Sequence, residues 1–313
     1  MEGKNSFKMK DKNIVYFDNA ATTFKPKRVI DKICEYYNEY SANSHRGDYD
    51  ISFRVDDEID STRELVKDFI NAKRKEEIIF TKNTTDSINM VVFGYFLNHL
   101  NSQDEIILSS SEHASNILPW MILSIKKDIK IVFVDSVNEK LNIDDLINKI
   151  NSHTKVISLA QITNVTGDKR DIKKVCEIAH KNNILLVVDA AQSAPHMKID
   201  VQELDCDFLA FSAHKMCGPT GVGVLYGKYN LLEKMLPFEY GGGMNLNYNE
   251  KSLELAEIPF RFEAGTPNIA GIIGFKEAIN YINDIGIDNI ERHVKYLRKY
   301  LIKELEKIPY IKI

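Results

Sequence analysis

The sequence predicts an α/β protein whose larger part is a doubly wound, mostly parallel sheet. Short apolar, β-branched runs alternate with longer amphipathic stretches along most of the chain, and βαβ units produce this order. Several short runs, such as Leu185–Val188, are apolar on both faces, which suits a sheet covered by helices on both sides. The 313 residues, 44% of them hydrophobic, suffice for two domains and exclude disorder as the main state.

The hydrophobic periodicity locates the individual elements. The predicted strands are 14–17, 77–81, 105–109, 130–135, 155–161, 184–189, 208–212 and 223–226. The predicted helices are 55–70, 88–100, 171–182, 268–283 and 287–308. A polar loop is predicted over 245–252, and a strand begins at 310. We therefore expect an N-terminal strip (1–21) that joins a small domain, a large domain (22–268) and the start of an incomplete α+β small domain (269–313).

Charge and composition exclude several classes of protein. Lysine and arginine number 41 against 45 acidic residues, so the net charge of −4 argues against a nucleic-acid binder. No apolar run approaches the roughly 20 residues that cross a bilayer, and the first residues lack the apolar stretch of a signal peptide. The four scattered cysteines fit a reducing cytoplasm. Cys206, His214 and Cys217 lack the paired spacing of a zinc site, so no metal is predicted.

An acidic and a basic residue follow two of the predicted strands. Asp189 ends the strand 184–189, and Lys215 follows the strand 208–212, so both can reach the crevice where open α/β sheets bind ligands. A lysine that forms a Schiff base and an aspartate that keeps a pyridinium nitrogen protonated are the minimum that pyridoxal phosphate (PLP) chemistry asks of a protein. Either residue alone is more often an ordinary loop residue. The pair, in order and with Gln192, Ser212 and His214 beside it, favours the PLP interpretation.

Three further segments carry candidate ligand contacts. Thr84 and Thr85 open a helix after a strand, where free N–H groups and the helix dipole bind anions, although N-capping alone also explains them. His113 follows another strand and could stack on a flat ring, or be an ordinary loop histidine. Asn164 could donate to a ring oxygen or simply form a turn. The glycines of 218–223 lack the spacing of a nucleotide-binding loop.

Together these segments resemble the class V aminotransferase group of fold type I PLP enzymes, and within it the cysteine desulfurase and selenocysteine lyase branch. The matching stretches are YFDNAATT (16–23), NSHRG (43–47), NTTDSIN (83–89), EHASNILPW (112–120), NVTG (164–167), VVDAAQSAPH (187–196), SAHKMCGPTGVGVLYG (212–227) and RFEAGTPN (261–268). They occur in the same order from one end of the chain to the other. The resemblance implies a PLP-dependent enzyme that converts L-cysteine to L-alanine and leaves persulfide sulfur for iron–sulfur or other sulfur delivery.

The resemblance also implies a role for each site residue. Lys215 would bind the cofactor covalently and act as acid and base, Asp189 would pair with the pyridine nitrogen, Gln192 would contact the ring hydroxyl side and His113 would stack on the ring. Thr84, Thr85, Ser212 and His214 would hold the phosphate, and Asn164 would touch cofactor or substrate. Thr266 would reach the phosphate of a partner subunit in a homodimer. His45 and Arg46 would line the substrate entrance.

Two features separate this chain from the pattern. The triple glycine at 241–243 is followed by Met244 and Asn245, where many members of the desulfurase branch have an acidic residue. The family's sulfur-accepting cysteine and its carboxylate-binding arginine would lie beyond residue 313, and none of the four cysteines matches the persulfide position. We therefore expect a C-terminally truncated chain that binds PLP at best weakly and, without an acceptor thiolate of its own, does not turn over cysteine as a desulfurase. The alternatives are another activity of the same family, such as epimerase, lyase or aminotransferase, and a non-catalytic PLP-binding remnant. A sulfur-acceptor protein is the expected partner, with no nucleic acid or membrane.

Overall fold

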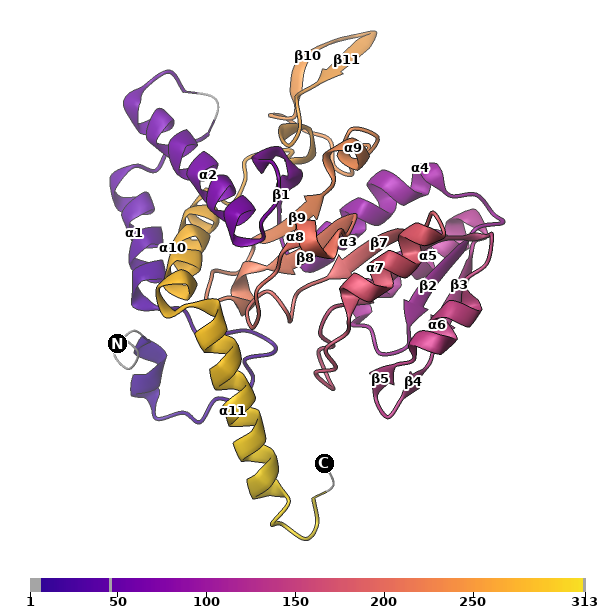
Figure 1. Ribbon diagram of the computed structural model, residues 1–313. Helices are drawn as coiled ribbons and strands as arrows, with labels where there is room; N and C mark the ends of the chain where they lie inside the picture. Colours follow the sequence, from indigo (N-terminus) through magenta and orange to yellow (C-terminus); the bar gives the residue numbers. More distant parts are fainter. Residues whose placement is uncertain (1–6, 45–46, 312–313) are drawn as a thin grey trace.

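A central sheet of seven strands organises the chain in the computed structural model, which describes residues 7–44 and 47–311 (Figure 1). The strand order is β1-β9-β8-β7-β6-β2-β3. Strands β3, β2, β6, β7 and β8 run parallel, and β9 is antiparallel to both β8 and β1. The strands are β1 (Ile78–Thr81), β2 (Glu105–Ser109), β3 (Lys130–Val134), β6 (Thr154–Ala160), β7 (Leu185–Asp189), β8 (Phe208–Ser212) and β9 (Gly223–Gly227). This topology confirms the predicted mostly parallel α/β fold.

Helices cover both faces of this sheet (Figure 1). The α-helices are α1 (Lys27–Glu39), α2 (Asp50–Phe69), α3 (Thr84–Met90), α4 (Leu97–His99), α5 (Leu118–Lys127), α6 (Ile143–Lys149), α7 (Ile172–Lys181), α8 (Val201–Leu204), α9 (Tyr229–Leu232), α10 (Ile269–Ile285) and α11 (Ile287–Leu305). A π-helical segment, η3 (Val91–Phe96), joins α3 to α4. Short 3-10 turns are η1 (Lys8–Lys12), η2 (Lys75–Glu77), η4 (Ala114–Asn116), η5 (Ala213–Lys215) and η6 (Phe260–Phe262).

Alternation along each strand divides the core into two apolar clusters. Leu186 and Val188 of β7 belong to the cluster that α2, α7 and α10 cover, whereas Val187 belongs to the cluster that η3 and α5 cover. Side chains of a strand alternate between the two faces of a sheet, so a strand buried on both faces must be apolar throughout. This requirement explains why the run Leu185–Val188 contains no polar residue.

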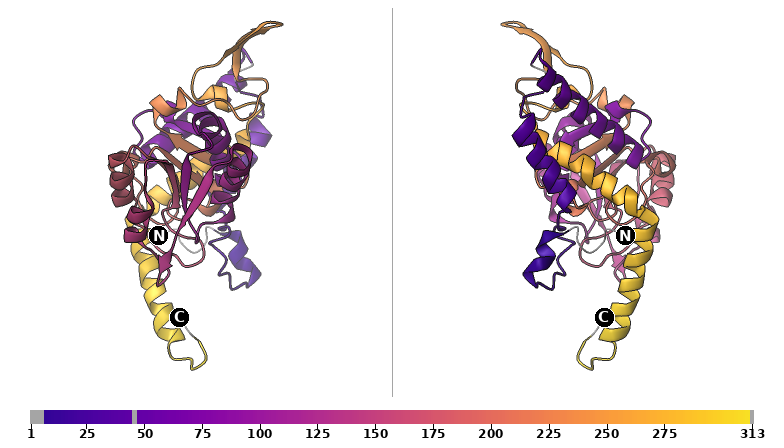
Figure 2. Two further views of the ribbon diagram at one scale, coloured as in Figure 1. Left: turned by 90° about the vertical axis from the view of Figure 1, so that its right-hand side faces the viewer. Right: turned by 90° about the vertical axis from the view of Figure 1, so that its left-hand side faces the viewer.

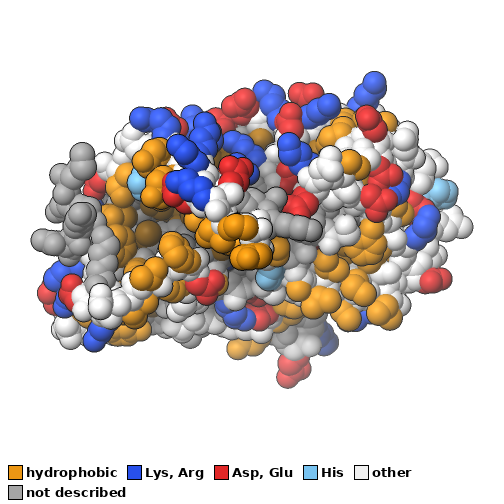
Figure 3. Space-filling model, turned by 90° about the horizontal axis from the view of Figure 1, so that it is seen from below, with side chains coloured by type: hydrophobic (Ala, Val, Ile, Leu, Met, Phe, Trp, Pro, Cys, Tyr) orange, Lys and Arg blue, Asp and Glu red, His pale blue; other side chains and the backbone are white. Residues whose placement is uncertain are grey.

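Two elements project from the body of the protein at opposite ends (Figure 2). One is the hairpin of β10 (Asn245–Asn249) and β11 (Ser252–Leu255). The other is α11, which has no buried residue and follows α10, itself packed between α1 and α2. The face seen from below carries hydrophobic side chains among charged ones (Figure 3). The exposed apolar and aromatic residues of α11 are Val294, Tyr296, Leu297, Tyr300 and Leu301.

Three sequence-based expectations about the elements are wrong. Residues 14–17 form no strand, and the side chains of Val15 and Phe17 are 81% and 88% exposed, because no neighbouring strand of the described chain lies beside this segment. Residues 245–252 lie in the β10–β11 hairpin, not in a loop. Tyr310 and Ile311 are not in a strand, and residues 312–313 lie outside the described residues. The two short strands β4 (Ser136–Val137) and β5 (Lys140–Leu141) were not predicted.

None of the helices in the described ranges combines the length and the apolar character that crossing a membrane requires.

Candidate active site

The carboxyl ends of the parallel strands surround one pocket of about 560 Å³. That volume lies within the roughly 300–1,000 Å³ typical of small-molecule sites, and its place at the edge of an open α/β sheet is where such folds bind ligands. The pocket brings together nine residues that the sequence singled out: Thr84, Thr85, His113, Asn164, Asp189, Gln192, Ser212, His214 and Lys215. They come from loops after β1, β2 and β6 and from the ends of β7 and β8.

Asp189 and Lys215 are the charged pair of the pocket. Asp189 is the last residue of β7 and is 5% exposed, and its Oδ1 accepts a hydrogen bond from the backbone N–H of Ala191 at 2.9 Å. Burial raises the pKa of Asp189. Burial also lowers the pKa of Lys215, and the Asp189 carboxylate opposes that shift. A lysine with a lowered pKa has more of the neutral amine, which is the form that attacks a carbonyl carbon.

The hydroxyl groups of Thr84 and Ser212 join the start of α3 to the end of β8. Thr84 donates its backbone N–H to Ser212 Oγ at 2.7 Å, and the two hydroxyl oxygens are 2.6 Å apart. Asn83 caps the helix, since its side chain accepts from the N–H of Asp86 at 2.9 Å. Asn83 therefore accounts for the N-cap, while Thr84 and Thr85 line the pocket, and anion binding at this helix start stays a prediction.

A close approach of two backbones holds this end of the pocket. A Cβ atom on Gly223, the first residue of β9, would lie only 2.5 Å from Cα of Asn83. Only glycine lets β9 pass so near to the turn before α3. The position of Thr84 and Thr85 therefore depends on a residue outside the pocket.

His113, His214 and Gln192 line the pocket from three different loops. His113 Nδ1 accepts from the backbone N–H of Ser115 at 3.1 Å, which fixes the ring. Partial burial and the nearby Lys215 lower the pKa of His113, and the same two causes, with Lys25, lower the pKa of His214. Gln192 donates from Nε2 to the carbonyl oxygen of Ala20 at 2.8 Å. Both rings are therefore biased toward the neutral form, which suits stacking and hydrogen bonding.

The remaining predicted residues lie elsewhere. Thr266 is exposed and is not among the residues that line the pocket. It follows Gly265, which has a φ of +82°. The segment before it is anchored by Glu263, whose carboxylate binds the buried Arg63 guanidinium at 2.7 and 2.8 Å and accepts from the N–H of Phe80 at 2.7 Å. His45 and Arg46 lie outside the described residues.

Sequence reasoning missed a buried ion pair behind His113. The guanidinium of Arg170 binds the carboxylate of Glu112, and both side chains are almost fully buried. Arg170 also donates to Ser109 Oγ at 3.1 Å and to Ser111 Oγ at 2.7 Å. This Glu112–Arg170 network therefore ties the loop after β2 to the segment before α7, and so places His113, the residue next to Glu112.

The N-terminal strip also contributes to the pocket without having been assigned there. Asp18, Ala20 and Ala21 line it, and Ala20 receives the Gln192 hydrogen bond. The quoted stretch YFDNAATT contains these residues, so the signal was present in the sequence. The sequence did not reveal that Gln192, 172 positions after Ala20, donates a hydrogen bond to the Ala20 carbonyl oxygen.

The fold and this pocket define a class of enzyme in which a lysine and an aspartate line one pocket at the carboxyl edge of a mostly parallel sheet. The family model described as aminotransferase class-V matches residues 15–313, and the chain belongs to that family. Members of the family are PLP-dependent enzymes.

Relatives place the chain among the cysteine desulfurases of that family. It is 43% identical to a probable cysteine desulfurase of Halalkalibacterium halodurans over 94% of this chain and 73% of the relative. It is 44% identical to a probable cysteine desulfurase of Borreliella burgdorferi, over 97% and 74% of the two chains. An apo cysteine desulfurase of Thermococcus onnurineus superposes with a TM-score of 0.93 at 38% identity, over 97% of this chain and 76% of that structure. A cysteine desulfurase of Escherichia coli gives 0.86 at 37% identity, over 91% and 72%.

The residues of the pocket fit PLP. Its aldehyde requires a lysine amine, which Lys215 supplies. Its pyridine nitrogen requires a carboxylate, and the buried Asp189 lines the pocket and can pair with that nitrogen. Its phosphate requires donors, and Thr84, Thr85, Ser212 and His214 all line the same pocket.

Proposed function

We propose that this protein, with PLP, converts L-cysteine to L-alanine and transfers the sulfur atom to a thiol as a persulfide. The observation that carries the proposal is the convergence of Lys215, Asp189 and the hydroxyl-lined helix start in one pocket of a chain related to cysteine desulfurases. The sum of the reaction is balanced: cysteine and a thiol, R–SH, give alanine and the persulfide R–S–SH.

PLP, when bound, supplies a cationic ring that accepts electron density from the substrate carbon. In this proposal Asp189 keeps the ring nitrogen protonated, and its burial strengthens that ion pair. Thr84, Thr85, Ser212 and His214 orient the phosphate. His113 would stack on the ring, Gln192 would contact its hydroxyl side, and Asn164 would contact the cofactor or the substrate.

When PLP and substrate are bound, Lys215 would serve as the acid and base of the reaction. Because burial lowers its pKa, the neutral Nζ would take a proton from the substrate Cα and later give it back to the bound substrate. The residues that line the described pocket include no cysteine. We therefore propose that the sulfur-accepting thiol reaches the substrate sulfur from outside this wall, and that it attacks as a thiolate because the thiolate is the nucleophile.

The assembly and the remaining site residues belong to the same proposal. We propose a cytoplasmic homodimer in which Thr266, exposed on its anchored turn, contacts the phosphate held by the partner subunit. His45 and Arg46 line the substrate entrance, and a sulfur-acceptor protein receives the persulfide. Residues 22–268 form the cofactor domain, and 1–21 with 269–313 belong to the small domain.

The test is to supply PLP, L-cysteine and dithiothreitol as the acceptor thiol, and to measure alanine, sulfide and pyruvate. We expect alanine and sulfide in equal amounts. Pyruvate with sulfide and no alanine would instead identify a C–S lyase and overturn the proposal. Absence of all three products in protein that shows the visible absorbance of bound PLP would also overturn it.

Two lysine variants make this test specific. Lys215→Ala removes the proposed covalent link and should lose both product formation and the visible absorbance of the Lys215-bound cofactor. Lys299→Ala changes an exposed lysine of α11 and should retain both. Equal activity in the two variants would contradict the assignment of Lys215.

A further inference from the structure

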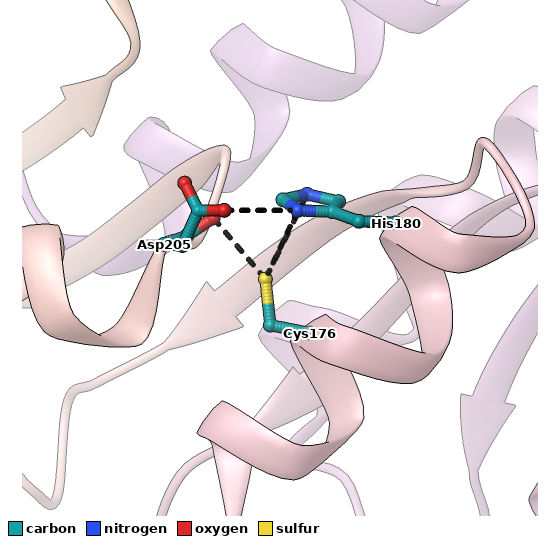
Figure 4. Close-up of side chains that lie close together, drawn as sticks. All are labelled: Cys176, His180 and Asp205. Carbon is teal, nitrogen blue, oxygen red and sulfur yellow. Dashed lines mark hydrogen bonds and ion pairs between the residues drawn. The ribbon is translucent and has the colours of Figure 1, made fainter.

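A second cluster of metal-ligating side chains lies at the amino ends of β7 and β8, the end of the sheet opposite the active site. Cys176 and His180 are one helical turn apart on α7, and Asp205 precedes β8 (Figure 4). Their potential ligand atoms all lie within 4.8 Å of one another. None of these three is among the residues considered as metal ligands from the sequence, which were Cys206, His214 and Cys217.

The distances within the cluster suit a tetrahedral ion. Cys176 Sγ lies 3.7 Å from both ring nitrogens of His180, and Nδ1 lies 3.1 Å from Asp205 Oδ2. Zinc bonds of roughly 2.3 Å to sulfur and 2.0–2.1 Å to nitrogen and oxygen give tetrahedral edges of about 3.3–3.6 Å. The two measured separations are close to these edges, and Sγ must turn toward Nδ1 for the three atoms to share one ion.

The other ring nitrogen of His180 already has the partner that a ligating histidine requires. His180 Nε2 lies 2.9 Å from Oδ2 of Asp207, which is 3% exposed and also accepts from the backbone N–H of Leu186 at 2.7 Å. Metal-bound histidines usually donate their second N–H to a carboxylate, which fixes the tautomer and the ring orientation. Asp207 therefore holds the ring with Nδ1 directed at Asp205.

Lys228 balances the two carboxylates. Its Nζ lies 2.6 Å from Asp205 Oδ1 and 3.1 Å from Asp207 Oδ1, so the Asp205 atom that faces His180 remains the other oxygen, Oδ2. The ion pair therefore orients Asp205 as a monodentate ligand.

A surface groove of about 410 Å³ gives the cluster access to solvent. It is lined by Cys176, His180 and Asp205 together with Lys173, Glu177 and Glu203. Three protein ligands and one water are a common zinc arrangement, and this groove leaves room for the water. In the metal-free protein the Cys176 thiol donates to the carbonyl oxygen of Asp205 at 3.1 Å. Burial raises the pKa of this thiol to about 12, so the thiol must release its proton to solvent as the metal binds.

We propose that Cys176, His180 and Asp205 form a binding site for Zn²⁺ or another thiophilic divalent cation, with water as the fourth ligand. The ion joins α7 to the segment that leads into β8. The site is separate from the pocket that holds Lys215, and the proposal does not depend on the reaction catalysed there.

Cobalt(II) tests the site in protein loaded with PLP, because the d–d absorption of tetrahedral Co²⁺ lies at longer wavelengths than that of the cofactor. We expect one Co²⁺ per chain with this absorption, which stoichiometric Zn²⁺ then displaces. Cys176→Ala should remove the absorption and weaken binding at least tenfold. Cys34→Ala, a change at an exposed cysteine, should leave both unchanged.

A second variant separates loss of the site from loss of the fold. Asp207→Asn keeps a hydrogen-bonding side chain beside His180 but removes the carboxylate, so it should weaken binding while the PLP absorbance is retained. Zn²⁺ should raise the thermal midpoint of the parent protein and of Cys34→Ala, but not of Cys176→Ala. Equal Co²⁺ affinity in Cys176→Ala and Cys34→Ala, or no tetrahedral absorption in the parent protein, overturns the proposal.

Discussion

Replacing Arg170 with methionine should destabilise the protein far more than removing a surface lysine does. Arg170 contacts Glu112, Ser109 and Ser111, and its side chain is 1% exposed, whereas that of Glu112 is fully buried. Methionine fills much of the same volume but leaves the Glu112 carboxylate with only the neutral donors of Asn116, at 2.8 Å, and Ala160 N–H, at 2.7 Å. Breaking a buried ion pair from one side costs about 3–5 kcal/mol, because the other charge stays buried without compensation.

Equilibrium unfolding in urea at pH 7 measures this loss. The only tryptophan, Trp120, is fully buried, and its Nε1 lies 3.5 Å from Oδ1 of Asn116, so its fluorescence reports on the network directly. The matched control is Lys75→Met. Lys75 pairs with Asp60 at 2.8 Å, but the two side chains are 38% and 53% exposed, and such pairs contribute at most about 1 kcal/mol.

The double variant Glu112→Gln with Arg170→Met distinguishes the charge from the packing. It removes the Glu112 charge together with its partner, and glutamine still offers an oxygen to Asn116 or Ala160. Asp168, whose Oδ2 lies 3.7 Å from Arg170 Nε, loses that partner in both variants, so it does not affect their comparison. We expect it to recover more than half of the stability lost in Arg170→Met. The reasoning is refuted if Arg170→Met and Lys75→Met lose the same free energy of unfolding within about 1 kcal/mol, or if the double variant is less stable than the single one.

Three further predictions follow from the pocket and the cysteines. The rate at which Lys215 reacts with PLP should rise with pH, with a midpoint below the ordinary lysine pKa of 10.5. Asp189→Asn should lower that midpoint further, because the Asp189 carboxylate stabilises the protonated amine. A higher midpoint in Asp189→Asn would contradict this reasoning. Gly223→Ala should lower the free energy of unfolding, measured in urea, by about 1–3 kcal/mol through overpacking. It should also weaken PLP retention during dialysis, and unchanged retention would exclude the proposed backbone contact with Asn83. The exposed Cys34 should react first with a disulfide reagent, whereas Cys206, whose burial raises its pKa, should react only on unfolding; mass spectrometry of the labelled peptides decides the order.

The elements that the sequence predicted well are those whose pattern is local. Strands β2 and β8 match their predicted bounds to the residue, because each is a buried run that ends at a polar residue before a turn. Asp189 and Lys215 could be paired in advance, since parallel strands bring their carboxyl ends to one edge. The same reasoning located His113 and Asn164 on the loops that surround the pocket.

The features that escaped prediction depend on distant partners. Arg170 stands between Lys169 and Asp171, a charged run typical of a solvated turn, and its partner Glu112 lies 58 positions away. Residues 14–17 show the opposite error, because a β-branched, apolar run forms no strand without a neighbour to pair with. The β10–β11 hairpin did carry a local signal, in that Leu246 and Tyr248 alternate with asparagines, but both side chains are exposed, so no buried face reinforced it.

The proposed cation site should affect stability without changing the chemistry of Lys215. Ser212 lies five positions after Asp207 along β8, a distance of about 16 Å at roughly 3.3 Å per residue. This exceeds the roughly 8 Å over which charges are screened at physiological salt, and the site opens on a solvent groove. Zn²⁺ should therefore raise the thermal midpoint while the midpoint of PLP capture against pH stays the same. If Zn²⁺ shifts the midpoint of PLP capture in the Cys176→Ala variant, a zinc ion binds in the active site instead. If Zn²⁺ shifts this midpoint in the parent protein alone, β8 transmits the effect of the ion to Lys215.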